Sequence, residues 1–151
     1  MMASCEIINC PKTEDAARKV WAEDFGPLLY EYLEREELRT GETHMVDVRG
    51  FMMAWEQNGI RVILARDKGE PCGFMITNTY MPLFNPFPVM IVDKWMSDNE
   101  ETERDLFEYL DTIIKMTGIT HVHVATHDGQ RLPEWVNTEP SDSYLMKRLE
   151  V

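Results

Sequence analysis

The chain has few basic residues relative to its acidic ones. Of its 151 residues, 15 are Lys or Arg and 27 are Asp or Glu, so the formal net charge is -12. This excess opposes binding to nucleic acid, because affinity for a phosphate backbone comes from Lys and Arg side chains that neutralise phosphates. We therefore expect no nucleic-acid partner, whereas a protein partner with a basic surface would suit the charge.

Long apolar runs and paired cysteines are also lacking. No segment approaches the roughly 20 apolar residues that span a bilayer, and Met1 to Cys10 has neither the basic start nor the apolar centre of a signal peptide. The sequence thus predicts a cytoplasmic protein without a membrane partner. Cys5, Cys10 and Cys72 are odd in number and lack the spacing of a metal site, so they are free thiols or include a Cys5–Cys10 disulfide.

The composition is that of one folded unit. Apolar residues make up 44% of the chain, and neither a shift of composition nor an internal repeat divides it. A chain of this length can bury one good core. We predict a single domain over residues 1–151.

The apolar pattern changes between a period of two and a period near 3.6 along the chain. Gly and Pro residues separate the segments, and Gly69 can close a hairpin between two β-rich runs. The segment from His127 to Ser143 reads as a loop, and Tyr144 to Val151 as either a strand or a short helix. The predicted strands are Ser4–Cys10, Ile60–Arg66, Pro71–Tyr80, Val89–Trp95 and Ile119–Thr126, and the predicted helices are Glu14–Asp24, Leu28–Leu38, Val46–Asn58 and Ser97–Met116.

The order of these elements resembles the GNAT superfamily of acyl-CoA-dependent N-acetyltransferases. The turn from Arg66 to Phe74 has the acidic, Gly-containing texture of the family's hairpin. The resemblance implies an α+β fold with a mixed central sheet of about six strands flanked by helices on both faces. A strand–helix–strand crossover makes Val89–Trp95 and Ile119–Thr126 parallel neighbours. Compact acidic chains of this kind are also similar to GNAT-like proteins encoded by bacteriophages, which would place the protein in a host cytoplasm or a virion.

The resemblance implies acetyl-CoA as cofactor. In the family the fourth strand binds the pantetheine arm, here Val92, Asp93 and Lys94, and the next turn wraps the pyrophosphate. That turn is Met96–Glu101 in this chain, and it contains no Gly, Arg or Gln. Ser97 and Asn99 are the candidate cofactor contacts there. The alternative is a structural capping box in which the Ser97 hydroxyl accepts from the first-turn amides and acidic residues occupy the place of the phosphates.

The chemistry of such a site needs a base for the acceptor amine and an acid for the leaving thiolate. Asp93 is the candidate base, with a local ion pair to Lys94 as the alternative. Tyr144 is the candidate acid, with plain packing as the alternative. His121 and His123 share a strand face, which allows either a metal pair or, as we expect, a polar sheet surface without metal.

Two further segments leave alternatives open. The loop around Asn85, with Leu83, Phe84 and Phe87, borders an acceptor groove or plugs the core. The acidic positions of the last helix could form a line of charge that mimics DNA. This line would consist of Asp98, Glu101, Asp105, Glu108 and Asp111.

Function therefore divides into two hypotheses. One is a divergent GNAT-type N-acetyltransferase. The other is a catalytically inactive GNAT-fold interaction protein, for example a phage virion component or a binder of host factors through its acidic surface. A V-shaped gap between Val89–Trp95 and Ile119–Thr126 favours the enzyme, and side chains that fill this gap favour the interaction protein.

Overall fold

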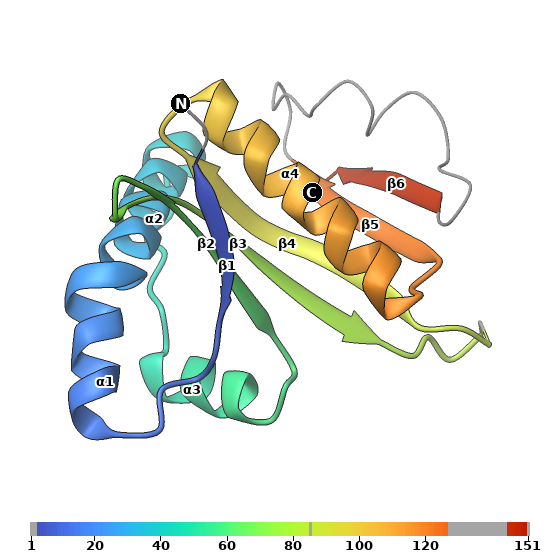
Figure 1. Ribbon diagram of the computed structural model, residues 1–151, viewed down its shortest axis with the longest axis horizontal. Helices are drawn as coiled ribbons and strands as arrows, with labels where there is room; N and C mark the ends of the chain where they lie inside the picture. The colour runs from blue at the N-terminus through green and yellow to red at the C-terminus, as the bar shows by residue number, and fades with distance from the viewer. Residues whose placement is uncertain (1–2, 85, 127–144, 151) are drawn as a thin grey trace.

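The computed structural model describes residues 3–84, 86–126 and 145–150, the last six as backbone (Figure 1). The predicted loop from His127 to Ser143 and the candidate acid Tyr144 lie outside the described residues. Six strands, four α-helices and one π-helix follow one another along the described chain. They are β1 (Ser4–Ile8), α1 (Glu14–Lys19), η1 (Val20–Asp24), α2 (Gly26–Thr40), α3 (Val48–Glu56), β2 (Arg61–Asp67), β3 (Glu70–Tyr80), β4 (Val89–Ser97), α4 (Glu100–Thr117), β5 (His121–Thr126) and β6 (Leu145–Glu150).

The strands form a single sheet in the order β1-β2-β3-β4-β5-β6. The first four strands pair antiparallel, whereas β4 with β5 and β5 with β6 pair parallel. The prediction of a mixed sheet of about six strands is confirmed, as is the parallel crossover from β4 through α4 to β5. Of the two alternatives for the last residues, the strand is the one observed.

The hairpin between β2 and β3 turns at two residues with left-handed backbone. Lys68 has φ 53° and Gly69 has φ 84°, the pair of positive values that a type I′ turn requires. The twist of such a turn matches the twist of the flanking strands. The glycine predicted to close the hairpin is therefore in the expected place.

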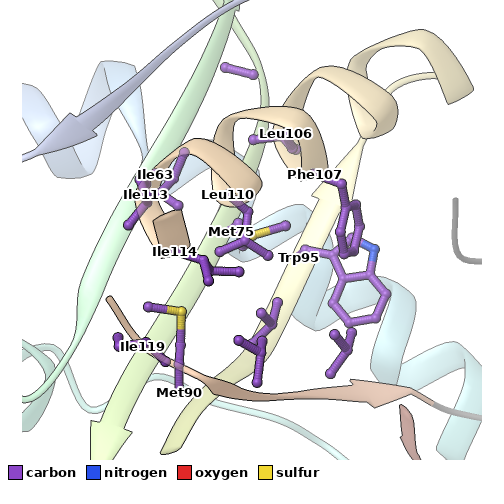
Figure 2. Close-up of a cluster of buried hydrophobic side chains, with 14 of the residues drawn as sticks. Ile63, Met75, Met90, Trp95, Leu106, Phe107, Leu110, Ile113, Ile114 and Ile119 are labelled. Carbon is purple, nitrogen blue, oxygen red and sulfur yellow. The ribbon is translucent and has the colours of Figure 1, made fainter. Parts of the chain in front are cut away.

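Helices cover both faces of the sheet, α4 on one and α1, η1, α2 and α3 on the other (Figure 1). Side chains of β2 alternate between the two cores, with Ile63 on the α4 side and Val62 on the other. Figure 2 shows the α4 core, where Leu106, Phe107 and other apolar side chains of the helix lie on the sheet. This alternation explains why β2 is apolar at every position from 62 to 65.

Aromatic rings join the helical layer to the other face. Phe25 is fully buried between η1 and α2. Four rings surround it with centroids 5.5–6.3 Å away, those of Trp21, Phe51, Trp55 and Phe74. Since Trp55 and Phe51 belong to α3, this cluster holds α3 against the sheet.

The helix predicted from Glu14 to Asp24 is present, but its second half is the π-helix η1. The amide of Phe25 bonds the carbonyl of Val20, 2.9 Å away, one residue further back than in an α-helix. A Cβ on Gly26 would lie 1.8 Å from the carbonyl oxygen of Trp21. The close backbone passage from η1 into α2 therefore requires glycine at position 26.

Three apolar predictions are wrong. Leu38, placed on the apolar side of its helix, is 88% exposed and packs in neither core. Leu83 and Phe84 are 94% and 96% exposed, so they do not plug the core. The prolines around them prevent pairing with a strand, and the loop projects from the end of the β3–β4 pair.

No helix within the described residues is long and apolar enough to cross a membrane.

Candidate functional site

Strand β4 has a bulge at Asp93. Along the β3–β4 ladder Val92 lies opposite Thr77, but Lys94 lies opposite Ile76, so Asp93 is an extra residue without a partner. A β-bulge bends its strand and redirects the side chains that follow. The chain thus interrupts its regular sheet at the residue proposed from the sequence as a base.

The bulge reverses the alternation of β4. Before it, Met90 and Val92 point into the α4 core, and after it Trp95 does so, although its position is odd. Met96 points into the opposite core. The bulge therefore directs both Trp95 and Met96 into apolar cores, and no sequence signal such as Gly marks its position.

The parallel pairing of β4 with β5 ends next to this bulge. Paired residues run from Val89 opposite His121 to Val92 opposite Val124, while β4 continues to Ser97 and β5 to Thr126. Past Val92 the backbone groups of β4 on the β5 side make no ladder bonds to β5. We call the ends of these two strands past Val92 and Val124, which do not pair with each other, the split.

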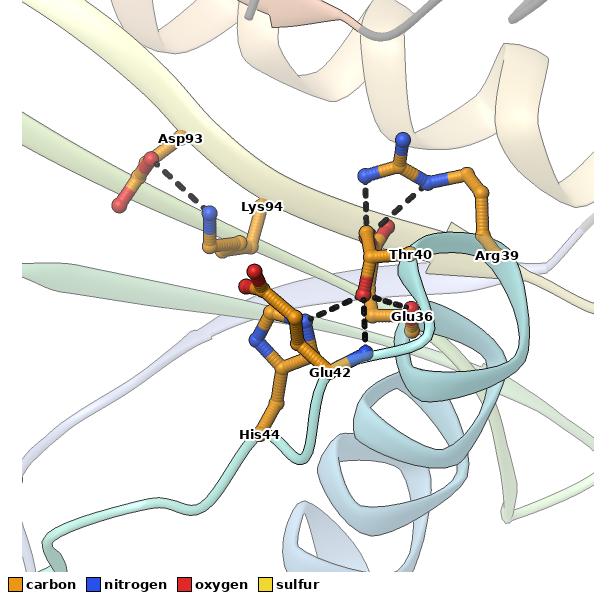
Figure 3. Close-up of polar contacts among 7 residues, drawn as sticks. All are labelled: Glu36, Arg39, Thr40, Glu42, His44, Asp93 and Lys94. Carbon is orange, nitrogen blue, oxygen red and sulfur yellow. Dashed lines mark hydrogen bonds and ion pairs between the residues drawn. The ribbon is translucent and has the colours of Figure 1, made fainter.

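Figure 3 shows Asp93 and Lys94 of β4 together with a polar cluster at the C-terminal end of α2, which consists of Glu36, Arg39, Thr40, Glu42 and His44. The Asp93 carboxylate lies 3.5 Å from the Lys94 ammonium, which confirms the predicted local ion pair, and both side chains are partly exposed. Burial and then the carboxylate of Glu36, with a smaller contribution from Asp93, raise the pKa of Tyr32 well above its ordinary value. Tyr32 therefore stays a neutral hydroxyl at this site at neutral pH.

The end of α2 is held together by Thr40. Its hydroxyl donates to the Glu36 carbonyl at 2.8 Å, accepts from the Glu42 amide at 3.2 Å, and lies 3.0 Å from a ring nitrogen of His44 (Figure 3). Arg39 binds the Glu36 carboxylate. These contacts place a carboxylate, a guanidinium and an imidazole beside β4. The sequence analysis missed them, because only the fold brings α2 next to Asp93.

The N-cap of α4 is Asn99, and the prediction of Ser97 in this role is wrong. Asn99 Oδ1 accepts from the Thr102 amide at 2.8 Å, whereas Ser97 still belongs to β4 and its hydroxyl donates to the Asn99 carbonyl at 3.0 Å. The Asp98 amide donates to the Cys72 carbonyl at 3.0 Å. The strand thus extends further than predicted, and both side chains proposed as cofactor contacts are engaged in shaping the start of the helix.

Carboxylates give the start of α4 a negative potential. Burial, followed by Asp105, raises the pKa of Cys5 to about 11. Burial, followed by Glu100, raises the pKa of Glu103, although the Trp95 indole donates to it and lowers it in part. A pyrophosphate needs free amides and positive charge at a helix start. The residues at this helix start do not fit the pyrophosphate of coenzyme A.

Trp95 lies at the split on the α4 side. Its side chain is 5% exposed, and its ring packs edge-on against Phe107 with centroids 5.7 Å apart. Figure 2 shows this indole beside Phe107, past the paired part of β4. The α4 side of the split is thus filled by an aromatic side chain, while the α2 side carries the polar cluster.

The other residues proposed from the sequence do not join this site. Asp105 is only 7% exposed and accepts from the Ala3 amide at 2.8 Å, so it does not belong to an exposed line of acids, and the proposed DNA mimicry is wrong at this position. His121 stacks on Phe87, 4.0 Å between centroids. Within the described residues no group of three metal-ligating side chains forms, and the three cysteines are free thiols.

Comparison with known proteins reveals solved structures of the same fold. No protein-family model matches the chain, and no curated protein matches it significantly. A ribosomal-protein-alanine N-acetyltransferase from Brucella melitensis biovar Abortus 2308 is similar with a TM-score of 0.61 and 17% identity, covering 89% of this chain and 84% of its own. A predicted acetyltransferase from Clostridium acetobutylicum, solved with acetyl-CoA, has a TM-score of 0.61 and 11% identity, covering 95% and 94%.

An aminoglycoside acetyltransferase from an uncultured soil metagenomic sample, solved with sisomicin, has a TM-score of 0.58 and 10% identity, covering 90% of this chain and 81% of its own. Identities this low establish the fold alone. The chain has the GNAT-type fold that the order of its elements predicted.

Proposed function

We propose that this chain, which has the fold of the GNAT acetyltransferases, is a divergent acyl-CoA-dependent N-acetyltransferase. The observation that carries the proposal is the end of β4–β5 pairing beside the Asp93 bulge. Backbone groups of Val92, Asp93 and Lys94 would hold the pantetheine arm of acetyl-CoA, whose thioester supplies the acetyl group when bound. Recognition rests on this arm, because the start of α4 repels the pyrophosphate.

Asp93 is the proposed general base. Its carboxylate is partly exposed, so an acceptor amine can reach it from solvent. It would take a proton from the ammonium form of the acceptor, which frees the nitrogen lone pair for attack on the thioester carbonyl. Tyr144, outside the described residues, is the proposed acid for the thiolate, and Ser97 and Asn99 support the site by shaping the start of α4.

Calorimetric titration with acetyl-CoA and with S-acetylpantetheine tests whether the protein binds the thioester arm without help from the pyrophosphate. S-acetylpantetheine has the thioester arm but no pyrophosphate or nucleotide, so we expect dissociation constants within about threefold of each other. Much tighter binding of acetyl-CoA would contradict the account of the α4 start. Absence of saturable heat with either compound would exclude the acetyltransferase.

The role of Asp93 is tested by Asp93→Asn. Mass spectrometry would follow the acetylation of a panel of primary amines. The panel includes a peptide with an N-terminal alanine and the aminoglycoside sisomicin, which represent the acceptor and the ligand named for the similar structures. Loss of a general base lowers turnover by roughly 10²- to 10⁴-fold while S-acetylpantetheine still binds. The control Glu108→Gln changes an exposed acid on α4 and should leave turnover unchanged.

A second candidate function is a GNAT-fold interaction protein without catalysis, in a phage virion or bound to a host factor. Two observations favour it: Trp95 occupies the α4 side of the split, and acids surround the start of α4. A partner with a basic surface would complement those acids. Two results together would favour this function over the enzyme. The protein would capture such a partner and the Glu101→Lys variant would not, and S-acetylpantetheine would not bind.

A further inference from the structure

A large pocket opens at the opposite end of the sheet from the start of α4. It has a volume of about 1080 Å³ and lies where β1 ends, β2 begins and β3 ends, with α3 as one wall. Along β3 it reaches Thr77, Asn78 and Thr79, whereas the start of α4 follows Ser97, which pairs with Gly73. The pocket is thus distinct from the start of α4, although Thr77 pairs with Val92 and brings one wall of the pocket next to the Asp93 bulge. The proposal above does not use the pocket.

Three cations from three segments line this pocket. They are Lys12 after β1, Arg49 on α3 and Arg61 at the start of β2, and one acid, Glu56, lines the pocket as well. Strand alternation places Arg61 on the same face of the sheet as Ile63, so Lys12 and Arg49 are the cations on the α3 side. In the part of the chain that the structure describes, none of the three cations forms an ion pair, although most other basic residues do. In a chain with net charge -12, counterions are plentiful. Even with Glu56 among them, the cations outnumber the acids in the lining of this pocket, which favours recognition of an anion.

An unpaired acceptor lies at the same place. The side-chain oxygen of Asn78 is buried and has no hydrogen-bond partner among the described residues. Asn78 follows Phe74 and Ile76 at steps of two on β3, so it points to the same side as they do, toward the layer that contains α3. A buried acceptor without a partner is destabilising, and a ligand N–H group that donates to it would remove this cost.

The remaining wall is largely apolar. Met52, Met53, Trp55 and Ile60 line it, and the Trp55 ring is fixed because its indole N–H donates to the Ile8 carbonyl at 3.2 Å. Methionine side chains adapt their shape to a bound apolar group. The volume is in the range of small-molecule pockets, which are mainly apolar with a few convergent polar groups.

We propose that this pocket binds a small organic acid in which a carboxylate, an N–H donor and an apolar body are joined, as in an N-acyl derivative of an apolar amino acid. The carboxylate meets Lys12 and Arg49, the N–H donates to Asn78, and the apolar body lies on Trp55 and the methionines.

Three matched probes test the chemistry by calorimetry and by the indole N–H resonance of Trp55. N-acetyl-L-phenylalanine has all three features, N-acetyl-L-phenylalaninamide lacks the charge, and 3-phenylpropionate lacks the N–H. We expect N-acetyl-L-phenylalanine to bind at least about tenfold more tightly than its amide and about threefold more tightly than 3-phenylpropionate. Equal binding of the acid and the amide, or no saturable binding of the acid, would overturn the proposal.

Variants then assign the contacts. Arg49→Ala and Lys12→Ala change exposed side chains and should each weaken N-acetyl-L-phenylalanine about tenfold while the amide is unaffected. Asn78→Ala should abolish the preference over 3-phenylpropionate. The matched control Arg104→Ala removes an exposed cation from α4 on the other face of the sheet. An equal loss in this control would mean that the cations act only through overall charge, which contradicts a built site.

Discussion

Where β4 leads into α4, carboxylates surround a capped helix start, and the pKa values of Cys5 and Glu103 are raised. At the other end of β3, three cations and a single acid, Glu56, line a pocket. Solved structures of this fold include one with acetyl-CoA, but in this chain the start of α4 is the acidic end. The positive charge that could hold an anion lies instead beneath α3.

The contrast shows that the net charge of -12 does not by itself predict the local electrostatic potential at either end of the sheet. A negative total predicted a basic partner, and the acidic end is consistent with that prediction, yet the far pocket has the opposite preference. Local potential depends on which charges the fold brings within about one Debye length of a site. Function in a divergent member of a common fold therefore has to be argued for each end separately.

The contrast can be broken at the basic end by Phe25→Ala, for which we expect the largest effect. Phe25 is fully buried and its ring contacts two rings of α3, so its removal should lower the free energy of unfolding by about 3–5 kcal/mol. Urea denaturation measures this change. Tyr30→Ala, at a 46% exposed residue of α2, is the control and should stay within about 0.5 kcal/mol. Equal losses in the two variants would contradict the role of Phe25 in holding α3.

At the acidic end, Asn99→Ala removes the side-chain cap of α4. The Thr102 amide then loses its acceptor, and we expect the free energy of unfolding to fall by about 1 kcal/mol. Ser97→Ala is the matched comparison, because Ser97 only donates to the Asn99 carbonyl, and its loss should cost less than about 0.5 kcal/mol. The reverse ranking in denaturation experiments would restore Ser97 as the cap.

A further prediction concerns the Cys5 thiol, which reports burial and the potential near Asp105. Its pKa of about 11 in the folded protein exceeds the ordinary value of 9.0. As pH rises past 9, the unfolded chain loses this proton first, so the contribution of Cys5 to stability is complete below pH 9 and is lost between about pH 9 and 11. The stability difference between the protein and Cys5→Ala should shrink over that interval.

Alkylation of Cys5 followed by mass spectrometry gives a direct measurement. The rate follows the thiolate fraction and should rise only toward pH 11, and Asp105→Asn should move this rise to lower pH because one source of negative potential is removed. Glu108→Gln serves as the control. A rate that already levels off near pH 9 would show that burial and Asp105 do not act on Cys5 as described.

The sequence predicted the elements well wherever local chemistry determines them. Gly69 has the positive φ value expected at its turn, and the long helix, predicted to end at Met116, ends at Thr117. The cap of α4 was assigned two residues early, because Ser97 and Asn99 have equally good capping side chains and only the length of β4 decides between them.

Features that depend on contacts distant in sequence were not predicted. The bulge at Asp93 arises from the register of β4 against β3, and no residue type marks it. Tyr32 and Glu36 became neighbours of Asp93 only through the packing of α2. The pocket cations Lys12, Arg49 and Arg61 come from three segments, so no spacing along the chain could have revealed them.

The position of β1 has a consequence for how the chain acquires its structure. Strands β2, β3 and β4 are neighbours in both sequence and sheet, whereas β1 pairs with β2 only across the whole segment of α1, η1, α2 and α3. Closing that long loop costs entropy before any pairing stabilises it, so the β2–β3 hairpin is expected to form first. During synthesis β1 leaves the ribosome before any other strand, yet it stays unpaired until Arg61–Asp67 has emerged, a window in which its free edge is open to chaperones.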